Sequence, residues 1–137
     1  MSITFSDLED AFLFVSSGSP FEHTAVLCRD NGKIYYKSDI GGFDEIPEDI
    51  DYEKCIEIPH KKDLNLGRSL VFEFVSECLP DEINEVNRIF SQKGAYSRFK
   101  NMLEDKGLLD EWHRYEDQCI KRALKRWCED EGIEVTG

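Results

Sequence analysis

The side chains with the clearest potential for chemistry are the cations gathered between residues 93 and 126. This stretch holds 9 Lys and Arg against 6 Asp and Glu, whereas the whole chain has 17 against 29 and a net charge of −12. Guanidinium and ammonium groups bind phosphates and carboxylates through charge-assisted hydrogen bonds. This basic stretch therefore predicts a binding surface for an anion or an acidic partner.

Four of these cations fall on one face of the last predicted helix, opposite an apolar stripe from Trp112 to Trp127. The preceding helix adds two more, with one aromatic side chain for stacking or hydrogen bonding. In the alternative interpretation, the cations pair with the chain's own carboxylates and solvate a helix. The predicted binding residues are Tyr96, Arg98, Lys100, Arg114, Lys121, Arg122 and Lys125.

A second polar cluster precedes the second half of the chain. His60, Lys61 and Lys62 are followed by Asp63, close to a predicted helix start. Backbone N–H groups and the helix dipole make such a start favourable for negative charge. We interpret these three residues as a candidate anion site.

The remaining polar residues give no pattern typical of a metal or cofactor site. His23, His60 and His113 have no second His or Cys at the short spacings that zinc sites use. The acidic stretch from Asp44 to Glu53 offers oxygen ligands, but Lys54 stands where an EF-hand needs glycine. We interpret that stretch as a surface loop and predict no metal and no cofactor.

Catalytic motifs are also missing from the sequence. It has no Gly-rich phosphate loop, no Gly-x-Ser-x-Gly and no His-Glu-x-x-His. The prediction therefore leans towards a protein without enzymatic activity.

Bulk charge and cysteine usage limit the class of protein. A net charge of −12 disfavours attraction to nucleic acid or an anionic membrane, which favours a protein as partner and leaves nucleic acid a subordinate alternative. Five cysteines without a Cys-x-x-Cys pair fit reduced thiols. The apolar run from Ala11 to Val15 follows acidic residues, so we expect no signal peptide and a cytoplasmic protein. Nothing in the sequence indicates an oligomeric state.

The first half of the chain predicts one helix and a small sheet. Ser6 and Glu9 have the spacing of a capping box, which starts a helix that continues to Val15. Strand-forming residues on both sides of Asp30-Asn31-Gly32 predict a hairpin with a type I′ turn. Cys55 to Ile58 predicts a third strand.

The second half changes to helical periodicity. Glycines and a proline at regular intervals separate four amphipathic stretches. The four helices are expected between Gly67 and Pro80, Asp81 and Gly94, Ala95 and Gly107, and Asp110 and Gly132. The fold class is therefore α+β, with an N-terminal helix, a small antiparallel sheet and a C-terminal cluster of four helices. We expect a single domain over residues 1–137, with a helix-and-sheet part (1–60) and a helical part (61–137).

Several short stretches together resemble a known group of proteins. They are Ile56-Glu57-Ile58-Pro59-His60, Asp63-Leu64-Asn65-Leu66-Gly67, Gly94-Ala95-Tyr96-Ser97-Arg98-Phe99-Lys100, Gly107-Leu108 with Trp112, and Trp127-Cys128-Glu129. The set resembles an uncharacterised family of small acidic bacterial proteins, whose most specific element is the run Gly-Ala-Tyr/Phe-x-Arg-Phe-Lys. The resemblance implies bacterial origin and one α+β unit, and it implies no reaction.

Three functions follow from these residues. The first is a non-enzymatic binding or regulatory module that uses the basic helical face. The alternative is an acidic adaptor or nucleic-acid mimic that binds a basic protein, with the acidic loop as the contact. The third is a small enzyme with a cleft between sheet and helices, in which His60, Asp63, Tyr96 or Arg98 would act.

Overall fold

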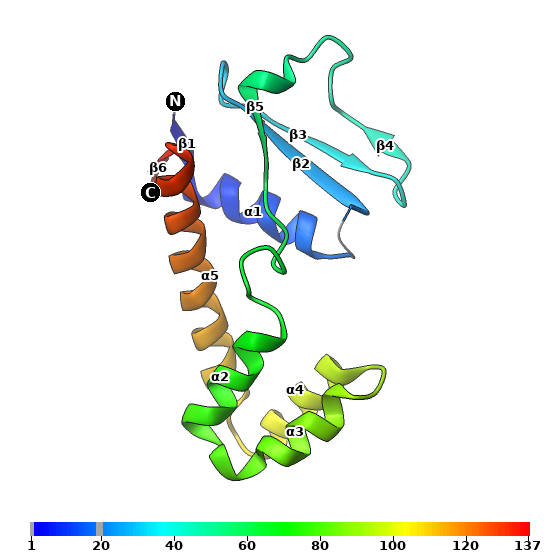
Figure 1. The fold of residues 1–137 in the computed structure, drawn as a ribbon, viewed down its shortest axis with the longest axis vertical. Coiled ribbons are helices and arrows are strands. Elements are labelled where there is room, and N and C mark those ends of the chain that lie inside the picture. Colours follow the sequence, from blue (N-terminus) through cyan, green and yellow to red (C-terminus); the bar gives the residue numbers. More distant parts are fainter. Residues whose placement is uncertain (1, 19–20) are drawn as a thin grey trace. The chain divides into compact units, whose positions relative to one another are not determined.

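The computed structural model describes residues 2–18 and 21–137 and confirms the predicted α+β class (Figure 1). The chain divides into two compact units, residues 1–64 with 123–137, and residues 65–122. We call the first the α/β unit and the second the helical unit. The long helix α5 (Leu109–Glu131) contributes residues to both. The expectation of one domain stays a prediction.

The α/β unit contains an antiparallel sheet in the order β4-β3-β2-β5 (Figure 1). Its strands are β2 (His23–Cys28), β3 (Ile34–Ser38), β4 (Phe43–Asp44) and β5 (Cys55–Glu57). The predicted hairpin and third strand are therefore confirmed. Strand β4 falls at the start of the expected acidic loop, which also contains the short 3-10 helix η1 (Tyr52–Lys54).

The hairpin turn differs from the predicted type I′ turn, which needs positive φ at two residues. Gly32 has a φ of 69°, whereas the φ of Asn31 is not positive. The N–H of Gly32 donates to the carbonyl of Cys28 at 2.9 Å, and the N–H of Cys28 donates to the carbonyl of Lys33 at 2.8 Å. Four residues therefore form the turn, and one glycine is sufficient for the reversal.

Helix α1 (Phe5–Ser16) begins earlier than its predicted capping box. Thr4 is the N-cap, and its hydroxyl accepts the N–H of Asp7 at 3.2 Å, so the predicted cap at Ser6 is wrong. Thr4 fills this role because it has extended backbone and lies three residues before the donor. The expected apolar stripe is confirmed, since Leu8, Ala11, Phe12 and Val15 are buried.

The ring of Phe14 on α1 lies against the sheet. Its centroid is 5.0 Å from His23, 5.1 Å from Tyr36 and 6.0 Å from Phe43. These contacts place α1 over the face of the sheet that carries Tyr36.

Two further strands pair in parallel at the ends of the chain. They are β1 (Ser2–Thr4) and β6 (Glu134–Thr136), and Ile3 lies opposite Val135. Neither was expected, because three-residue segments carry little periodic signal and their pairing joins residues more than a hundred positions apart.

The helical unit contains the four predicted helices. They are α2 (Arg68–Cys78), α3 (Ile83–Phe90), α4 (Ala95–Asp105) and the part of α5 up to residue 122. Pro80 begins the 3-10 turn η2 (Pro80–Glu82) between α2 and α3, as its fixed φ favours.

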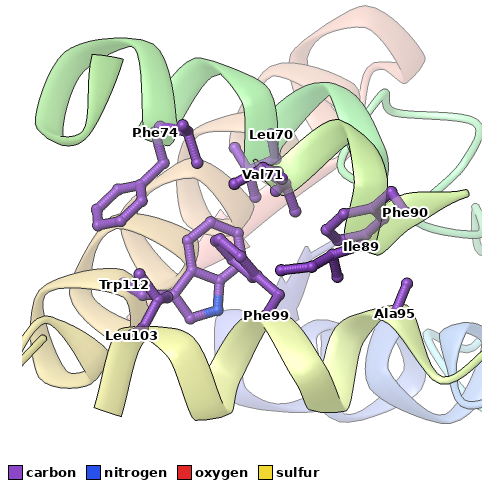
Figure 2. Close-up of a cluster of buried hydrophobic side chains, with 11 residues drawn as sticks. Leu70, Val71, Phe74, Ile89, Phe90, Ala95, Phe99, Leu103 and Trp112 are labelled. Atoms are coloured by element: carbon purple, nitrogen blue, oxygen red, sulfur yellow. The ribbon is translucent and has the colours of Figure 1, made fainter. Parts of the chain in front are cut away.

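Aromatic packing fills the core of this unit (Figure 2). Trp112 is 1% exposed, and its ring lies 5.3 Å from Phe74 and 5.2 Å from Phe99 in edge-to-face geometry. Burying a large apolar side chain stabilises a fold by about 1.5–3 kcal/mol. The other buried members are Leu70, Val71, Val75, Val86, Ile89, Phe90, Ala95 and Leu103.

Within the described part of the chain, no helix combines the length and the apolar character that crossing a membrane requires.

Candidate functional site

The predicted basic face on α5 is partly neutralised by the helix itself. Arg114 lies 2.7 Å from a carboxylate oxygen of Glu111, and Lys121 lies 3.0 Å from one of Asp117. These side chains are 66% and 49% exposed. Ion pairs at such exposed positions contribute about 0.2–1 kcal/mol, so another anion could replace either carboxylate.

The other predicted cations lie in different surroundings. Lys125 belongs to the α/β unit, where its ammonium nitrogen is 5.9 Å from the ring centroid of Phe5. Lys100 on α4 and Arg122 on α5 are exposed residues of the helical unit. Four of the predicted cations therefore lie on α5, whereas Arg98 and Lys100 lie on α4.

Arg98 lies in a groove between α3 and α4, which has a volume of about 370 Å³. Its guanidinium donates a hydrogen bond to the side-chain oxygen of Gln92. Ile89 and Met102 form the apolar part of the groove lining. Glu85 and Arg88, which also line the groove, form an ion pair with each other. The remaining lining residues are Glu82, Asn101 and Asp105.

Tyr96 has a packing role at the start of α4. Its ring meets that of Phe90 edge to face at 5.1 Å. Burial is the main cause that raises the pKa of Tyr96, and the nearby charge of Arg68 acts in the opposite direction. Arg68 donates to the carbonyl oxygen of Phe90 at 2.7 Å, at the end of α3, where cations are favourable. Sequence reasoning missed Arg68, because its partner lies 22 residues away.

The predicted anion site at His60, Lys61 and Lys62 is occupied by the protein's own hydrogen bonds. The N–H of His60 donates to the Asp63 carboxylate at 3.0 Å, and that of Lys61 donates to the Ser16 hydroxyl at 3.1 Å. The N–H of Lys62 donates to Nδ1 of His60 at 3.1 Å. These three backbone donors therefore already have partners within the protein.

A second groove, which sequence reasoning missed, lies between α1 and β3 in the α/β unit and has a volume of about 380 Å³. Asp7 and Asp10 stand one helical turn apart on α1 and line one side. Tyr35 and Tyr36 line the other, with Lys33 at the turn. Only the packing of α1 on the sheet brings these residues together.

The electrostatics of this groove are dominated by carboxylates. Burial raises the pKa of Tyr36, and Asp10, Asp7 and Glu45 raise it further in that order. A side-chain oxygen of Glu45 also accepts the N–H of Tyr36 at 3.3 Å. Carboxylates on α1 and after β4 therefore act on this tyrosine, and such an environment favours a positively charged ligand.

The charge of the molecule is concentrated in the same unit. The α/β unit has 8 Lys and Arg against 18 Asp and Glu, a net charge of −10, whereas the helical unit has 9 against 11, a net charge of −2. Its field therefore adds to the attraction that the groove carboxylates exert on a cation.

Three cysteine thiols have pKa values above the ordinary range. Burial raises the pKa of Cys55 and Cys119, and that of Cys128 to about 11, which disfavours their thiolate forms. Within residues 2–18 and 21–137, no three His, Cys, Asp or Glu side chains are grouped as metal ligands.

Comparisons with known proteins add no assignment. No protein-family model, curated protein or solved structure matches the chain.

Proposed function

We propose that the protein is a non-enzymatic binding module, and that its partner is a basic protein segment held in the groove between α1 and β3. The observation that carries this proposal is that Asp7 and Asp10 on α1 line the same groove as Tyr36 on β3. Carboxylates attract a lysine or arginine, and the ring of Tyr36 can add a cation–π contact to its charge, worth about 0.5–1 kcal/mol at an exposed site. Of the interpretations of the sequence, the acidic adaptor is thus favoured over the basic helical face.

The groove suits one or two cationic side chains of an extended segment. Its volume of about 380 Å³ is near the lower end for specific ligand sites. The charge of −10 on the same unit would increase the association rate and make affinity fall as salt is added.

A lysine- and arginine-rich peptide with a fluorescent label provides the probe. Fluorescence anisotropy should detect binding to the wild type that weakens from low to high salt. The double variant Asp7→Asn with Asp10→Asn should bind about tenfold more weakly, since two contacts of about 0.7 kcal/mol each are lost.

The matched control is Glu48→Gln with Asp49→Asn, which removes the same charge from the acidic loop of the same unit. It should change affinity by less than about twofold if the groove is the site. If both double variants weaken peptide binding equally, the groove is not the binding site, and the peptide is attracted by the net charge alone.

A second candidate keeps the basic residues as the binding surface, now centred on the groove between α3 and α4. The specific observation in its favour is that the Arg98 guanidinium donates its hydrogen bond to Gln92, a neutral side chain, so that this bond does not neutralise the charge. The partner would be an acidic segment. A glutamate-rich peptide should lose binding to the variant Arg98→Glu and keep binding to Lys93→Glu. Unchanged binding by Arg98→Glu would remove this candidate.

A further inference from the structure

Cys28 and Cys55 lie directly opposite each other on two paired strands. Cys28 ends β2, Cys55 begins β5, and the antiparallel register aligns them. Hydrogen bonds join Arg29 to Lys54 at 2.8 Å and Ile58 to Ala25 at 2.9 Å. Bonded and non-bonded pairs alternate along an antiparallel ladder, so Cys28 and Cys55 form a non-bonded pair.

This position brings two side chains close together on one face of the sheet. In a non-bonded pair the Cα atoms are about 4.5 Å apart, within the range of about 4.4–6.8 Å that disulfides use. Both residues are free thiols, and the neighbouring Cys28 is among the causes that raise the pKa of Cys55. A small movement of one strand would therefore bring the two sulfur atoms within bonding distance.

The surroundings allow that movement. Strand β5 is an edge of the sheet and has only three residues. Cys28 is 8% exposed, whereas Cys55 is more accessible and its thiol donates to the carbonyl oxygen of Asp51 at 3.2 Å. An oxidant in solution would reach Cys55 first.

We propose that Cys28 and Cys55 are a site of reversible oxidation, at which a small disulfide oxidant converts two thiols into one cross-strand disulfide. The Cys55 thiolate attacks one sulfur of the oxidant and forms a mixed disulfide, which releases the first small thiol. The Cys28 thiolate then attacks Sγ of Cys55 and releases the second. Two protein thiols lose two electrons and two protons, and one oxidant disulfide becomes two thiols.

Oxidation would fasten β5 to β2 and close a chain loop from residue 28 to residue 55. Restricting the unfolded chain in this way stabilises the folded state. Burial comes first among the causes that raise the pKa of Cys55, followed by Cys28, Asp51 and Asp30. The thiolate is scarce at neutral pH for this reason, and the experiment therefore uses mildly alkaline buffer.

The test uses the full chain with excess oxidised glutathione, followed by alkylation of the remaining thiols and mass spectrometry. Trypsin cuts after Arg29, Lys54 and Lys61, so each of the 5 cysteines falls in a different tryptic peptide. Peptide 1–29 should be found linked to peptide 55–61, with loss of two free thiols, and a dithiol reductant should reverse both changes. Thermal unfolding of the oxidised protein should shift upwards.

Matched variants separate this pair from general thiol oxidation. Cys78→Ser, at an exposed cysteine, should leave the linked peptide unchanged, whereas Cys55→Ser and Cys28→Ser should remove it. If Cys28→Ser lacks the far-ultraviolet spectrum of the wild type, Cys55→Ser at the more accessible position decides. No linked peptide in the wild type, or a peptide 1–29 linked mainly to a peptide other than 55–61, would overturn the proposal.

Discussion

Nε2 of His60 donates a hydrogen bond to the carbonyl oxygen of Gly18 at 2.8 Å, across 42 positions of the sequence. The donor is assigned because Nδ1 accepts the N–H of Lys62, which leaves the proton of a neutral imidazole on Nε2. His60 is 4% exposed. It therefore joins the segment after β5 to the segment after α1 from inside the α/β unit.

Replacing this imidazole should lower the free energy of unfolding. In His60→Ala, the Gly18 carbonyl and the Lys62 N–H lose their partners, which should cost about 1–3 kcal/mol. Urea unfolding followed by circular dichroism measures the change. His113→Ala, at an exposed position on α5, is the control and should stay within about 0.5 kcal/mol. A similar cost for both variants would argue against the structural role of His60.

The buried indole of Trp112 gives a second prediction. Its Nε1–H has no hydrogen-bond acceptor among the described residues. Trp112→Ala should cost about 3–5 kcal/mol through the cavity it leaves. Trp112→Phe should cost clearly less, because it keeps an aromatic ring between Phe74 and Phe99 and removes an unsatisfied donor. Urea unfolding measures the stability of both variants. An equal loss of stability in Trp112→Ala and Trp112→Phe would contradict an energetic penalty for the unsatisfied Nε1–H.

Alkaline pH should destabilise the helical unit through Tyr115. Burial is the first cause that raises the pKa of Tyr115 to about 12, and its hydroxyl donates to Glu73 at 3.4 Å. An unfolded tyrosine loses its proton at a pKa of about 10. The neutral hydroxyl therefore stabilises the fold fully below pH 10, and this contribution is lost as the pH rises to 12.

Two tyrosine variants test this window. The stability of the wild type relative to Tyr115→Phe should decline between about pH 10 and pH 12. In a titration that follows tyrosinate absorbance, the ionisation at the highest pH should disappear in Tyr115→Phe and remain in Tyr52→Phe. An ionisation at the highest pH that remains in Tyr115→Phe would contradict the assignment.

Gly94 should be sensitive to any side chain, because its φ of 72° lies in the left-handed region at the start of α4. An added Cβ meets nothing within 4 Å, so the cost is conformational. Gly94→Ala should lose about 1–2 kcal/mol of stability, and Gly94→Asn should lose less. Thermal unfolding of both variants measures the difference. An Asn cost equal to that of Ala would indicate a steric origin.

Local patterns predicted most of the elements. The periodicity of Phe74, Phe99 and Trp112 gave helices whose buried faces meet in one core. The turn type at Gly32 was wrong because Asn31 tolerates two backbone conformations and the strands select one. The cap of α1 was wrong because Thr4 and Ser6 both have suitable hydroxyls.

The candidate sites were less accessible to sequence reasoning. The pairing of Arg114 with Glu111 follows from their spacing of three residues, so the sequence already contained that signal. No comparable spacing connects Asp10 with Tyr36 or Cys28 with Cys55, which the fold brings near each other.

By itself, the sequence determined the acidic charge, the order of the main helices and strands, and their apolar faces, because these depend on residues within a few turns of each other. Only the tertiary structure decided that His60 is an internal hydrogen-bonding residue, that carboxylates on α1 line the same groove as Tyr36, and that Cys28 faces Cys55. These relationships depend on strand register and on the packing of α1 against the sheet. Both arise from contacts between distant segments that no local pattern encodes.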